Sequence, residues 1–338
     1  MTRLPDVPFD VAVVGGGPAG VAAALWAARY RRRVVMVDAG QPRNRWTTAT
    51  HGYLGLEGLA PAEVLRAARD GLDRYPEVDV VDGRRVVSAT REPDEVISLA
   101  LDDGQCLRAL RVILATGVRD VFPAVEHFEK YFGRAIFTCP SCDGYEAQGK
   151  VAAVVGRTPE MLTFAIGLLD WACSVVAIHD DGDEDGDEDG DEDRNDRSPF
   201  ESVAPDRVPL ETVTGRVASV CGEEGRLRSL ELDDGRSVPC DVAFWLMRHE
   251  QHSDLAARLG CEISPEGCVV VDEDGATTAP NVYAAGDMTP GPHLVQIAAA
   301  DGARAGIHAA LSLRGQAGSP MSPDPAPDPE DVLDAAAG

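Results

Sequence analysis

The stretch FDVAVVGGGPAGVAAALWAARYRRRVVMVD, residues 9–38, decides the fold of this chain. An apolar run leads into a glycine-rich turn, an alanine-rich segment of helical character follows, and a second apolar run ends the stretch. Short apolar runs bounded by turns predict buried parallel strands, so this order predicts one βαβ unit. These residues therefore indicate an α/β protein.

The turn of this βαβ unit carries a GxGxxG motif. Gly15 permits a tight turn, Gly17 lets the backbone approach a pyrophosphate, and Gly20 allows close packing of the helix. Asp38 ends the second strand eighteen residues after Gly20, where a carboxylate would accept hydrogen bonds from ribose hydroxyls. A glycine-rich helix entry without a ligand is the alternative, but the flanking strands and the acid favour a dinucleotide site. The predicted contacts in this turn are Gly15, Gly17, Pro18, Ala19 and Gly20.

Two later segments end in small-residue turns of the same kind. RVILATG predicts a buried strand that ends at Ala115, Thr116 and Gly117. VYAAGD places Gly286 and Asp287 where a strand meets a helix of small residues. An amide and a carboxylate at that point would hold ribityl or phosphate oxygens of a long cofactor. Alone, this second turn is ordinary, and it gains meaning from the first motif.

GKVAAVVGRTPEMLTFAIGLLDWACSVVAIHDD, residues 149–181, repeats the strand, glycine turn, helix and strand of the first unit. A second nucleotide-type fold is therefore predicted between the segments that form the first. The expected fold class is α/β, with two Rossmann-like nucleotide-binding domains and the second inserted in the first. We expect the first domain at 1–120 and 245–314, the inserted domain at 121–244, and a flexible acidic tail at 315–338.

The charge balance limits the partners of the 338-residue chain. Its formal net charge is −26, with 57 Asp and Glu against 31 Lys and Arg. Phosphate-backbone binding needs clustered Lys and Arg, so this balance excludes a nucleic-acid partner. Eleven of the acids lie at 180–193, yet the rest of the chain is still acidic. An acidic surface suits a high-salt cytoplasm, and a genome that prefers Arg, with one acidic insertion, is the plainer alternative.

The chain carries no signal for a membrane. No apolar run reaches the roughly 18 residues that a membrane-spanning helix needs. The first ten residues lack the apolar region of a signal peptide. We therefore expect a cytoplasmic protein with no membrane partner.

Among the eight cysteines, Cys139 and Cys142 alone stand at CxxC spacing. A CxxC pair supplies either a redox dithiol or half of a zinc site. No second CxxC or spaced His cluster completes a zinc site, so we expect no metal. In a reducing cytosol the other cysteines are expected to be buried or inert thiols, with Cys261 and Cys268 structural. These other cysteines are Cys106, Cys173, Cys221, Cys240, Cys261 and Cys268.

The CxxC pair lies in FTCPSCDGYEAQGKVAAVVG, residues 137–156, where Asp-Gly follows it and the inserted unit begins. With GGGPAG, ATG and YAAGD in this order, nearly the whole chain up to about residue 314 resembles the FAD-binding disulfide reductases. Within them it is most similar to the low-molecular-weight thioredoxin reductase family. The resemblance implies the fold of the class II pyridine nucleotide-disulfide oxidoreductases, with FAD in the first domain and an NAD(P)H-type inserted domain.

The resemblance also implies roles for the residues at the pair. Cys139 would meet the substrate disulfide, and Cys142 would exchange electrons with the flavin. Asp143 would move the proton that accompanies thiol and flavin chemistry, and a helix or turn cap is its alternative role. A homodimer is implied in the same way, as is a thioredoxin-like protein or a small-molecule dithiol or disulfide as the substrate.

The inserted unit departs from the family at the expected nicotinamide site. Gly156 remains, but Thr158 replaces the second glycine of the turn and Met161 replaces its small third position. Side chains would then meet a pyrophosphate. The family carries a basic cluster after the strand that ends here at His179, whereas this chain continues into the acidic run 180–193. These carboxylates repel a 2′-phosphate unless the run is a solvated insertion, so FAD is the expected cofactor and NADPH is doubtful.

The leading prediction is an FAD-dependent dithiol/disulfide oxidoreductase that resembles thioredoxin reductase. An NADPH-independent flavin dithiol oxidase that uses oxygen is the first alternative, because CPxCDGYE and THGYLG, residues 50–55, resemble that branch. His51 and His293 would then lie near the flavin ring, although a lone His is more often a surface residue. A non-enzymatic, flavin-bound redox sensor is the alternative of another class.

Overall fold

The computed structural model describes residues 7–157, 160–180, 209–223 and 225–314. The predicted tail at 315–338 and all but the first residue of the acidic run 180–193 lie outside this part of the chain. The chain forms two compact units, unit 1 within Met1–Pro42, Glu63–Arg119 and Gln251–Gly338, and unit 2 within Arg43–Ala62 and Asp120–Glu250. No helix of the described residues is long and apolar enough to cross a membrane.

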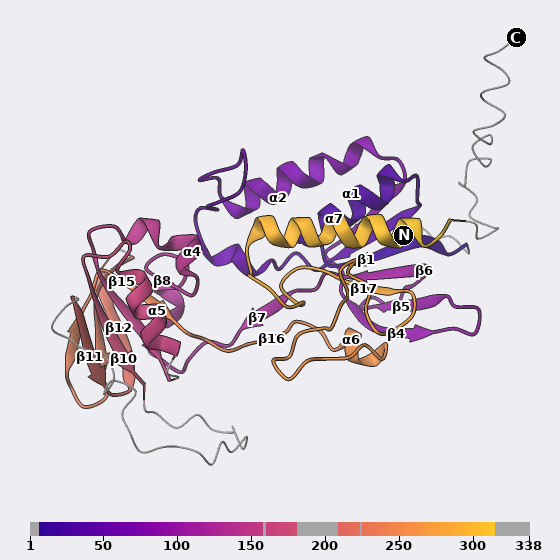
Figure 1. Ribbon diagram of the computed structural model, residues 1–338. Helices are drawn as coiled ribbons and strands as arrows, with labels where there is room; N and C mark the ends of the chain where they lie inside the picture. Colours follow the sequence, from indigo (N-terminus) through magenta and orange to yellow (C-terminus); the bar gives the residue numbers. More distant parts are fainter. Residues whose placement is uncertain (1–6, 158–159, 181–208, 224, 315–338) are drawn as a thin grey trace, which may run out of the picture. The chain divides into compact units, whose positions relative to one another are not determined.

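Unit 1 is built on a sheet that has seven strands in the described residues (Figure 1). The sheet order is β3-β2-β1-β6-β5-β4, and β17 also pairs with β6. Its strands are β1 (Phe9–Val14), β2 (Val34–Asp38), β3 (Val78–Asp82), β4 (Val86–Arg91), β5 (Ile97–Leu101), β6 (Cys106–Leu114) and β17 (Val282–Ala284). All neighbouring pairs are parallel except β4 with β5 and β5 with β6.

The apolar run of β1 is nearly continuous because both faces of the sheet are covered. Val11 and Val13 pack on one side against helices α1 (Pro18–Arg29) and α7 (Val295–Leu311). Ala12 and Val14 pack on the other side with β4, β5 and the short helix α6 (Leu255–Arg258). A strand buried on both faces favours apolar residues at every position, and β1 shows them except at Asp10, whose buried carboxylate accepts from the N–H of Arg33 at 2.8 Å.

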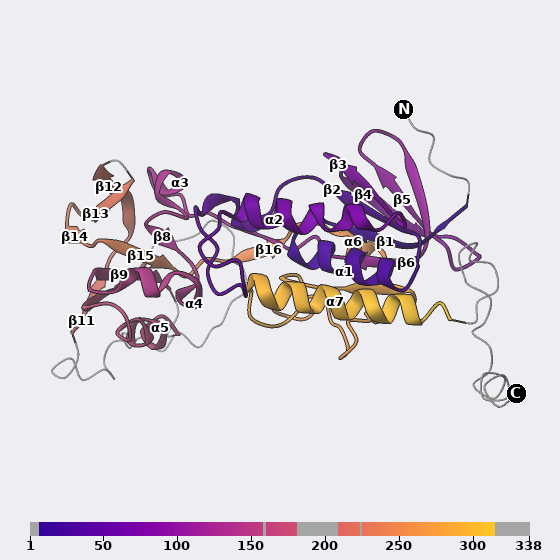
Figure 2. The same cartoon turned by 90° about the horizontal axis from the view of Figure 1, so that it is seen from above.

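Helices α1 and α7 lie side by side over one face of this sheet (Figure 2). Gly302 of α7 faces the backbone of α1 so closely that an added Cβ would stand 1.9 Å from the carbonyl oxygen of Ala19. At Gly306 the corresponding distance to the carbonyl oxygen of Ala23 is 2.4 Å. The alanines of α1 and the glycines of α7 therefore let the two backbones touch, and this contact fixes the glycine turn that precedes α1.

Unit 2 contains a second α/β fold. In the described residues it has a five-stranded parallel sheet of order β11-β10-β9-β15-β8 and a three-stranded antiparallel sheet of order β12-β13-β14. The strands are β8 (Ile136–Phe137), β9 (Val151–Gly156), β10 (Ser174–His179), β11 (Leu210–Thr214), β12 (Val217–Glu223), β13 (Arg226–Leu232), β14 (Ser237–Pro239) and β15 (Val242–Trp245). Helix α5 (Glu160–Leu168) packs on one face of the parallel sheet, and the antiparallel sheet packs on the other.

The remaining described elements are short, apart from α2. They are η1 (Arg43–Trp46), α2 (Pro61–Asp70), η2 (Leu72–Arg74), α3 (Phe128–Tyr131), α4 (Pro140–Asp143), η3 (Tyr145–Ala147), β7 (Val118–Asp120) and β16 (His249–Gln251). Strands β7 and β16 pair with each other where the chain passes between the units. The α/β fold class with two Rossmann-like units, the second inserted in the first, agrees with the sequence prediction.

Two segments lie elsewhere than the predicted boundaries put them, and the shorter is residues 245–250, which were expected in the first domain at 245–314 and fall in unit 2. Residues 43–62 were expected in the first domain, 1–120, and instead pack within unit 2. Trp46 packs on the ring of Phe122 with centroids 5.4 Å apart, and Arg43 pairs with the carboxylate of Asp120. These long-range contacts leave no trace in local sequence patterns. The assignment of FAD and of a nicotinamide nucleotide to particular domains stays a prediction.

The contact between α1 and α7 gives a test of this packing. Gly302→Ala should lower the free energy of unfolding by about 2 kcal/mol or more, because a methyl group forced against backbone cannot be relieved by a rotamer change. The control is Gly167→Ala in α5, where an added Cβ meets nothing within 4 Å. That change should raise stability by about 0.5–1 kcal/mol, because alanine favours the helix. Urea unfolding of both variants measures the difference, and equal stabilities would show that α1 and α7 can separate.

Candidate active site

The glycine turn before α1 is shaped by backbone contacts that exclude side chains. Gly15 has a φ of +106°, and its added Cβ would stand 2.2 Å from the carbonyl oxygen of Ala115. An added Cβ at Gly20 would stand 1.8 Å from the carbonyl oxygen of Gly15. Over Gly17, by contrast, the space is open. The turn therefore has no room for side chains at Gly15 and Gly20, and over Gly17 it is open to the approach of a ligand.

The start of α1 suits an anion. Gly17 is the N-cap residue and makes no side-chain cap hydrogen bond, and Pro18 opens the helix. The first turn holds no acidic residue. The first N–H groups of a helix have no acceptor within the helix, and their dipoles favour negative charge. A diphosphate would therefore find donors here without competition from a side chain.

The structure brings the other predicted cofactor residues of unit 1 to the same turn. The backbone N–H of Ala115 donates to the carbonyl oxygen of Val14, at 2.8 Å. Gly286, with a φ of +77°, lies so close to Ala19 that an added Cβ would stand 2.9 Å from the Ala19 Cβ. Asp287 follows Gly286 directly and is partly exposed. Three turns that are far apart in the sequence thus meet around the start of α1.

The remaining two predicted residues, Thr116 and Gly117, continue from Ala115. The hydroxyl of Thr116 lies 3.7 Å from the sulfur of Met288. Gly117 has a φ of +64°, and its carbonyl oxygen accepts from the N–H of His252. Their backbone is therefore held in place within unit 1.

Asp38 is held at the end of β2 by a partner that the sequence did not reveal. Its Oδ1 accepts from the N–H of Gly16 at 3.0 Å, and its Oδ2 pairs with the guanidinium of Arg69. Arg69 also reaches Asp82, at 2.7 Å, and its Nε is buried without a hydrogen-bond partner. Asp38 is only 8% exposed. No local motif marks Arg69, because it follows Asp38 by 31 residues.

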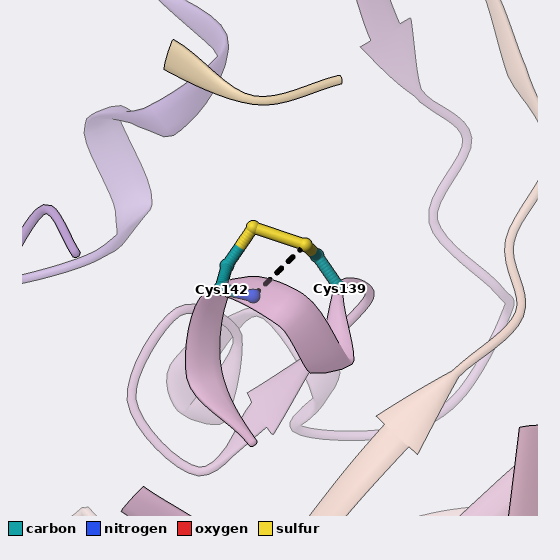
Figure 3. Close-up of a disulfide and its surroundings, with 2 residues drawn as sticks. All are labelled: Cys139 and Cys142. Atoms are coloured by element: carbon teal, nitrogen blue, oxygen red, sulfur yellow. Dashed lines mark hydrogen bonds between the residues drawn. A yellow bond between two sulfur atoms is a disulfide. The ribbon is translucent and has the colours of Figure 1, made fainter. Parts of the chain in front are cut away.

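The predicted redox pair is a disulfide at the start of the short helix α4. Cys139 is the N-cap residue and Pro140 opens the helix, with the Cα atoms of Cys139 and Cys142 5.3 Å apart. The N–H of Cys142 donates to the Sγ of Cys139 at 3.1 Å (Figure 3). After reduction, the same donor would stabilise a thiolate on Cys139. The geometry therefore favours Cys139 as the sulfur that attacks a substrate.

The residue after this helix has to be a glycine. An added Cβ at Gly144 would stand 2.4 Å from the carbonyl oxygen of Pro140 and 2.9 Å from the ring of Trp171. The Asp-Gly that follows the cysteine pair is thus a packing requirement of the tight turn. This glycine lets the turn after the CxxC helix pack against the indole ring of Trp171.

Asp143 completes α4 and is partly buried. Burial raises the pKa of its carboxyl to about 7, the positive charge of His51 lowers it, and the negative charge of Glu146 raises it. Loss of water disfavours the charged form of an acid, which is the larger effect here. An acid that titrates near neutral pH next to a disulfide can both give and take protons.

The two histidines singled out in the sequence lie in different units. His51 belongs to unit 2 and pairs with Glu57 and with Glu146, the latter three residues after Asp143. His293 belongs to unit 1 and precedes the residue that caps α7. Sequence patterns assigned no role to Glu57 or Glu146. Glu146 stands within the quoted CDGYE, and its position near the disulfide was the signal that could have found it.

The second glycine turn is only partly described, since residues 158–159 lie outside the described residues. Gly156 ends β9, and an added Cβ there would stand 3.4 Å from the side chain of Met161. Met161 is fully buried in the core between α5 and the parallel sheet. Glu160 is an acidic residue in the first turn of α5. This helix start therefore differs from that of α1, where no acid is present.

The carboxyl end of β10 carries an acid where the resemblance leads us to expect a basic cluster. Asp180 follows β10 and is 8% exposed, and its carboxylate lies 3.8 Å from the guanidinium of Arg157. The ring Nε2 of His179 lies 3.2 Å from the carbonyl oxygen of Arg157. The arginine described at this point is thus already paired with an acid.

The other six cysteines form no disulfide. Burial raises the pKa of the Cys240 thiol to about 12 and also raises the pKa of the Cys261 thiol. Both therefore stay protonated and inert, as expected for structural thiols. Cys106, Cys173 and Cys221 are instead exposed, so the expectation of buried thiols is not met at these three positions. Cys268 is partly buried.

Comparison with known proteins shows the family. The family model of pyridine nucleotide-disulphide oxidoreductases matches residues 9–302. The chain is 30% identical to thioredoxin reductase tcpT of Claviceps purpurea over 82% of this chain and 86% of that protein. It is 32% identical to the F component of alkyl hydroperoxide reductase from Pseudomonas putida over 89% of this chain but 57% of that protein.

A solved structure extends the likeness to three dimensions. The crystal structure of an oxidoreductase from Agrobacterium tumefaciens superimposes with a TM-score of 0.78 at 32% identity, over 91% of this chain and 99% of that one. Membership of the family implies binding of a flavin and of a nicotinamide nucleotide. The chain belongs to the pyridine nucleotide-disulphide oxidoreductase family, on its thioredoxin reductase-like side, and is a flavin-dependent disulfide oxidoreductase.

Proposed function

We propose that this enzyme transfers electrons between FAD and a thioredoxin-like protein or a small disulfide by way of Cys139 and Cys142. The geometry of the cysteine pair is the main support. The two cysteines form a disulfide at the start of α4, with a backbone donor aimed at one sulfur and an acid of pKa about 7 in the next position. The response of the bound flavin to dithiol and to nicotinamide nucleotides tests this function.

The residues of unit 1 fit FAD. The open space over Gly17 and the uncapped start of α1 would take the diphosphate, and Asp38 would accept from ribose hydroxyls. The turn at Gly286 and Asp287 would hold a further part of the same long molecule. When bound, FAD supplies the two-electron chemistry of the reaction. Arg69 keeps the Asp38 carboxylate in place at the edge of this site.

The cysteines carry out the exchange in two steps. In the reduced enzyme the thiolate of Cys139 attacks one sulfur of the substrate disulfide, so that an Sγ–S bond forms and the substrate S–S bond breaks. The thiolate of Cys142 then attacks the Sγ of Cys139, the enzyme disulfide forms, and the second substrate thiolate leaves. The two protons of the enzyme dithiol end on the two substrate thiols, so atoms and electrons balance.

Asp143 is the proton carrier in this scheme. Its carboxylate takes a proton from a cysteine thiol, and its acid form returns that proton to a leaving thiolate. A pKa of about 7 leaves both forms populated near neutral pH, which suits a group that works in both directions.

The substrate proposed first is a thioredoxin-type disulfide. The support is the relation to tcpT of Claviceps purpurea, a protein named thioredoxin reductase, over most of both chains. A small-molecule dithiol or disulfide would meet the same chemistry at Cys139. A homodimer is proposed from the family resemblance.

A second function, an NADPH-independent dithiol oxidase, is favoured by the expected nicotinamide site. Glu160 stands in the first turn of α5, and the buried carboxylate of Asp180 follows β10. Glu160 disfavours a diphosphate at this helix start, and Asp180 disfavours the 2′-phosphate of NADPH, since like charges at close range repel. In this reaction a substrate dithiol and oxygen become a disulfide and hydrogen peroxide, with the electrons passing through the cysteines and FAD. The first steps at the cysteines are then the reverse of those above.

Anaerobic bleaching of the flavin distinguishes these functions. Dithiothreitol should bleach the bound flavin of the wild type, and NADPH should do so at least about tenfold more slowly because of the acids near β10. Cys142→Ser should not bleach with dithiothreitol, whereas Cys173→Ser, at an exposed cysteine, should behave as the wild type. Rapid bleaching by NADPH would contradict the electrostatic argument, and the reductase would then be the function that remains. Fast reoxidation by air after dithiol bleaching is the mark of the oxidase.

The pKa of Asp143 also predicts how stability depends on pH. Folding raises this pKa from 3.8 to about 7, so the folded state holds the extra proton between these values. The stability that the proton contributes is complete below about pH 3.8 and is lost as the pH rises through about 7. Asp143→Asn is neutral throughout and should unfold less easily than the wild type at about pH 8, by on the order of 1–3 kcal/mol.

Urea unfolding at about pH 5 and pH 8 measures this effect. The control is Asp170→Asn, an exposed acid of the same unit, which should leave the pH dependence unchanged. An Asp143→Asn variant that follows the wild-type pH dependence would show that this carboxyl is not held in its acid form.

A further inference from the structure

A compact loop in unit 2 carries His51 to the neighbourhood of the disulfide helix. The loop is closed at its base, where the N–H of Thr50 donates to the carbonyl oxygen of Leu59 at 2.7 Å and the N–H of Gly58 donates to that of Thr50 at 2.9 Å. Gly52, Gly55 and Gly58 all have positive φ values, which permit its tight turns. These hydrogen bonds and turns give the loop a defined conformation, and His51 lies at its start.

The carboxylate of Glu57 fixes the orientation of the imidazole. Its Oε1 lies 2.7 Å from the Nδ1 of His51, and its Oε2 accepts from the N–H of Gly52 at 2.8 Å. A carboxylate accepts, so Nδ1 carries a proton and the other ring nitrogen is turned to a second partner. That Nε2 lies 3.5 Å from the Oε1 of Glu146. His51 thus spans from its own loop to the turn that follows the CxxC helix.

The charged groups that act on His51 within the described part of the chain are acids. They are Glu57, Glu146 and Asp143, and together they raise the pKa of the imidazole above its ordinary value, with the hydrogen bond to Glu57 as the largest cause. Those whose charges act on Asp143 are His51 and Glu146. The side chain of His51 is 25% exposed, so solvent screens these charges only in part. His51 therefore lies among carboxylates that favour its charged form.

We infer that His51 is a positioning residue for the thiol chemistry: it is fixed by Glu57, directs its second ring nitrogen to Glu146 in the turn that follows the CxxC helix, and so helps Asp143 to exchange protons with the cysteines. The inference rests on the proposed role of Cys139, Cys142 and Asp143. Without the imidazolium, Asp143 would be left with burial and the charge of Glu146, and both of these hold the proton on. The carboxylate that must accept a cysteine proton would then form only at higher pH.

The test compares rates of anaerobic flavin bleaching by dithiothreitol across pH. His51→Gln removes the charge, so the limb of the profile that reflects the Asp143 carboxylate should move up by about 0.5–1 pH unit. The rate should fall about three- to tenfold relative to wild type near pH 6.5 and approach the wild-type rate above about pH 8. The dithiothreitol concentration at half-maximal rate should stay the same, because the imidazole acts on a proton and not on substrate binding.

Two further variants separate charge from shape. His51→Lys keeps a cation beside the carboxylates and should restore most of the wild-type profile. Glu57→Gln keeps a hydrogen-bond acceptor but loses the charge that holds the proton on His51, and should give a smaller shift in the same direction. The matched control is His127→Gln, which breaks a similar pair with Glu126, at 3.5 Å, in the same unit. It should leave the profile unchanged.

An unchanged profile for His51→Gln would overturn the inference, as would a Lys variant that behaves like the Gln variant. A shift of equal size in His127→Gln would overturn it too, because the effect would then follow from the loss of any histidine charge in unit 2. Failure of dithiothreitol to bleach the wild type is a different result, since it removes the proposed function itself. Thermal unfolding of each variant verifies that the profiles compare folded proteins.

Discussion

The approach of backbone to backbone around the start of α1 is the constraint on which unit 1 depends. Gly15 touches the strand end at Ala115, Gly20 touches Gly15, and Gly302 of α7 touches Ala19. Each contact leaves no room for a Cβ, so the turn can adopt only one shape. That shape leaves the N–H groups of the helix start and the open face of Gly17 for a ligand. The glycines that pack the core of unit 1 are therefore also those proposed to bind the cofactor.

The two nucleotide-type units of the chain have diverged at their ligand ends while keeping the same strand order around the first βαβ. In unit 1 the helix start is free of acids, and Asp38 is balanced by Arg69. In unit 2 the helix start carries Glu160, and the end of β10 carries a buried Asp180. The two helix starts therefore present different charges to an anion, although both units share an α/β fold.

At the disulfide, burial and charge act in opposite directions on one acid. Desolvation raises the pKa of Asp143, and the imidazolium of His51 lowers it. A pKa of about 7 leaves both forms of this acid populated near neutral pH, which suits a group that is to give and to take protons. The tight turn at Gly144 holds this acid at the end of the CxxC helix. A packing requirement and a chemical requirement thus meet within six residues.

The sequence alone determined the features whose cause is local. Glycines at 15, 17 and 20 between two apolar runs predict a strand, a tight turn and a helix of an α/β fold. A CxxC followed by Asp-Gly places two sulfurs and an acid within five consecutive residues. Only the tertiary structure decided that residues 43–62 join unit 2, that Arg69 holds Asp38, and that Glu57 orients His51 toward Glu146. These pairs arise from the path of the chain through space. The pKa of Asp143 belongs with them, because burial is a property of the folded state and leaves no mark in the order of residues.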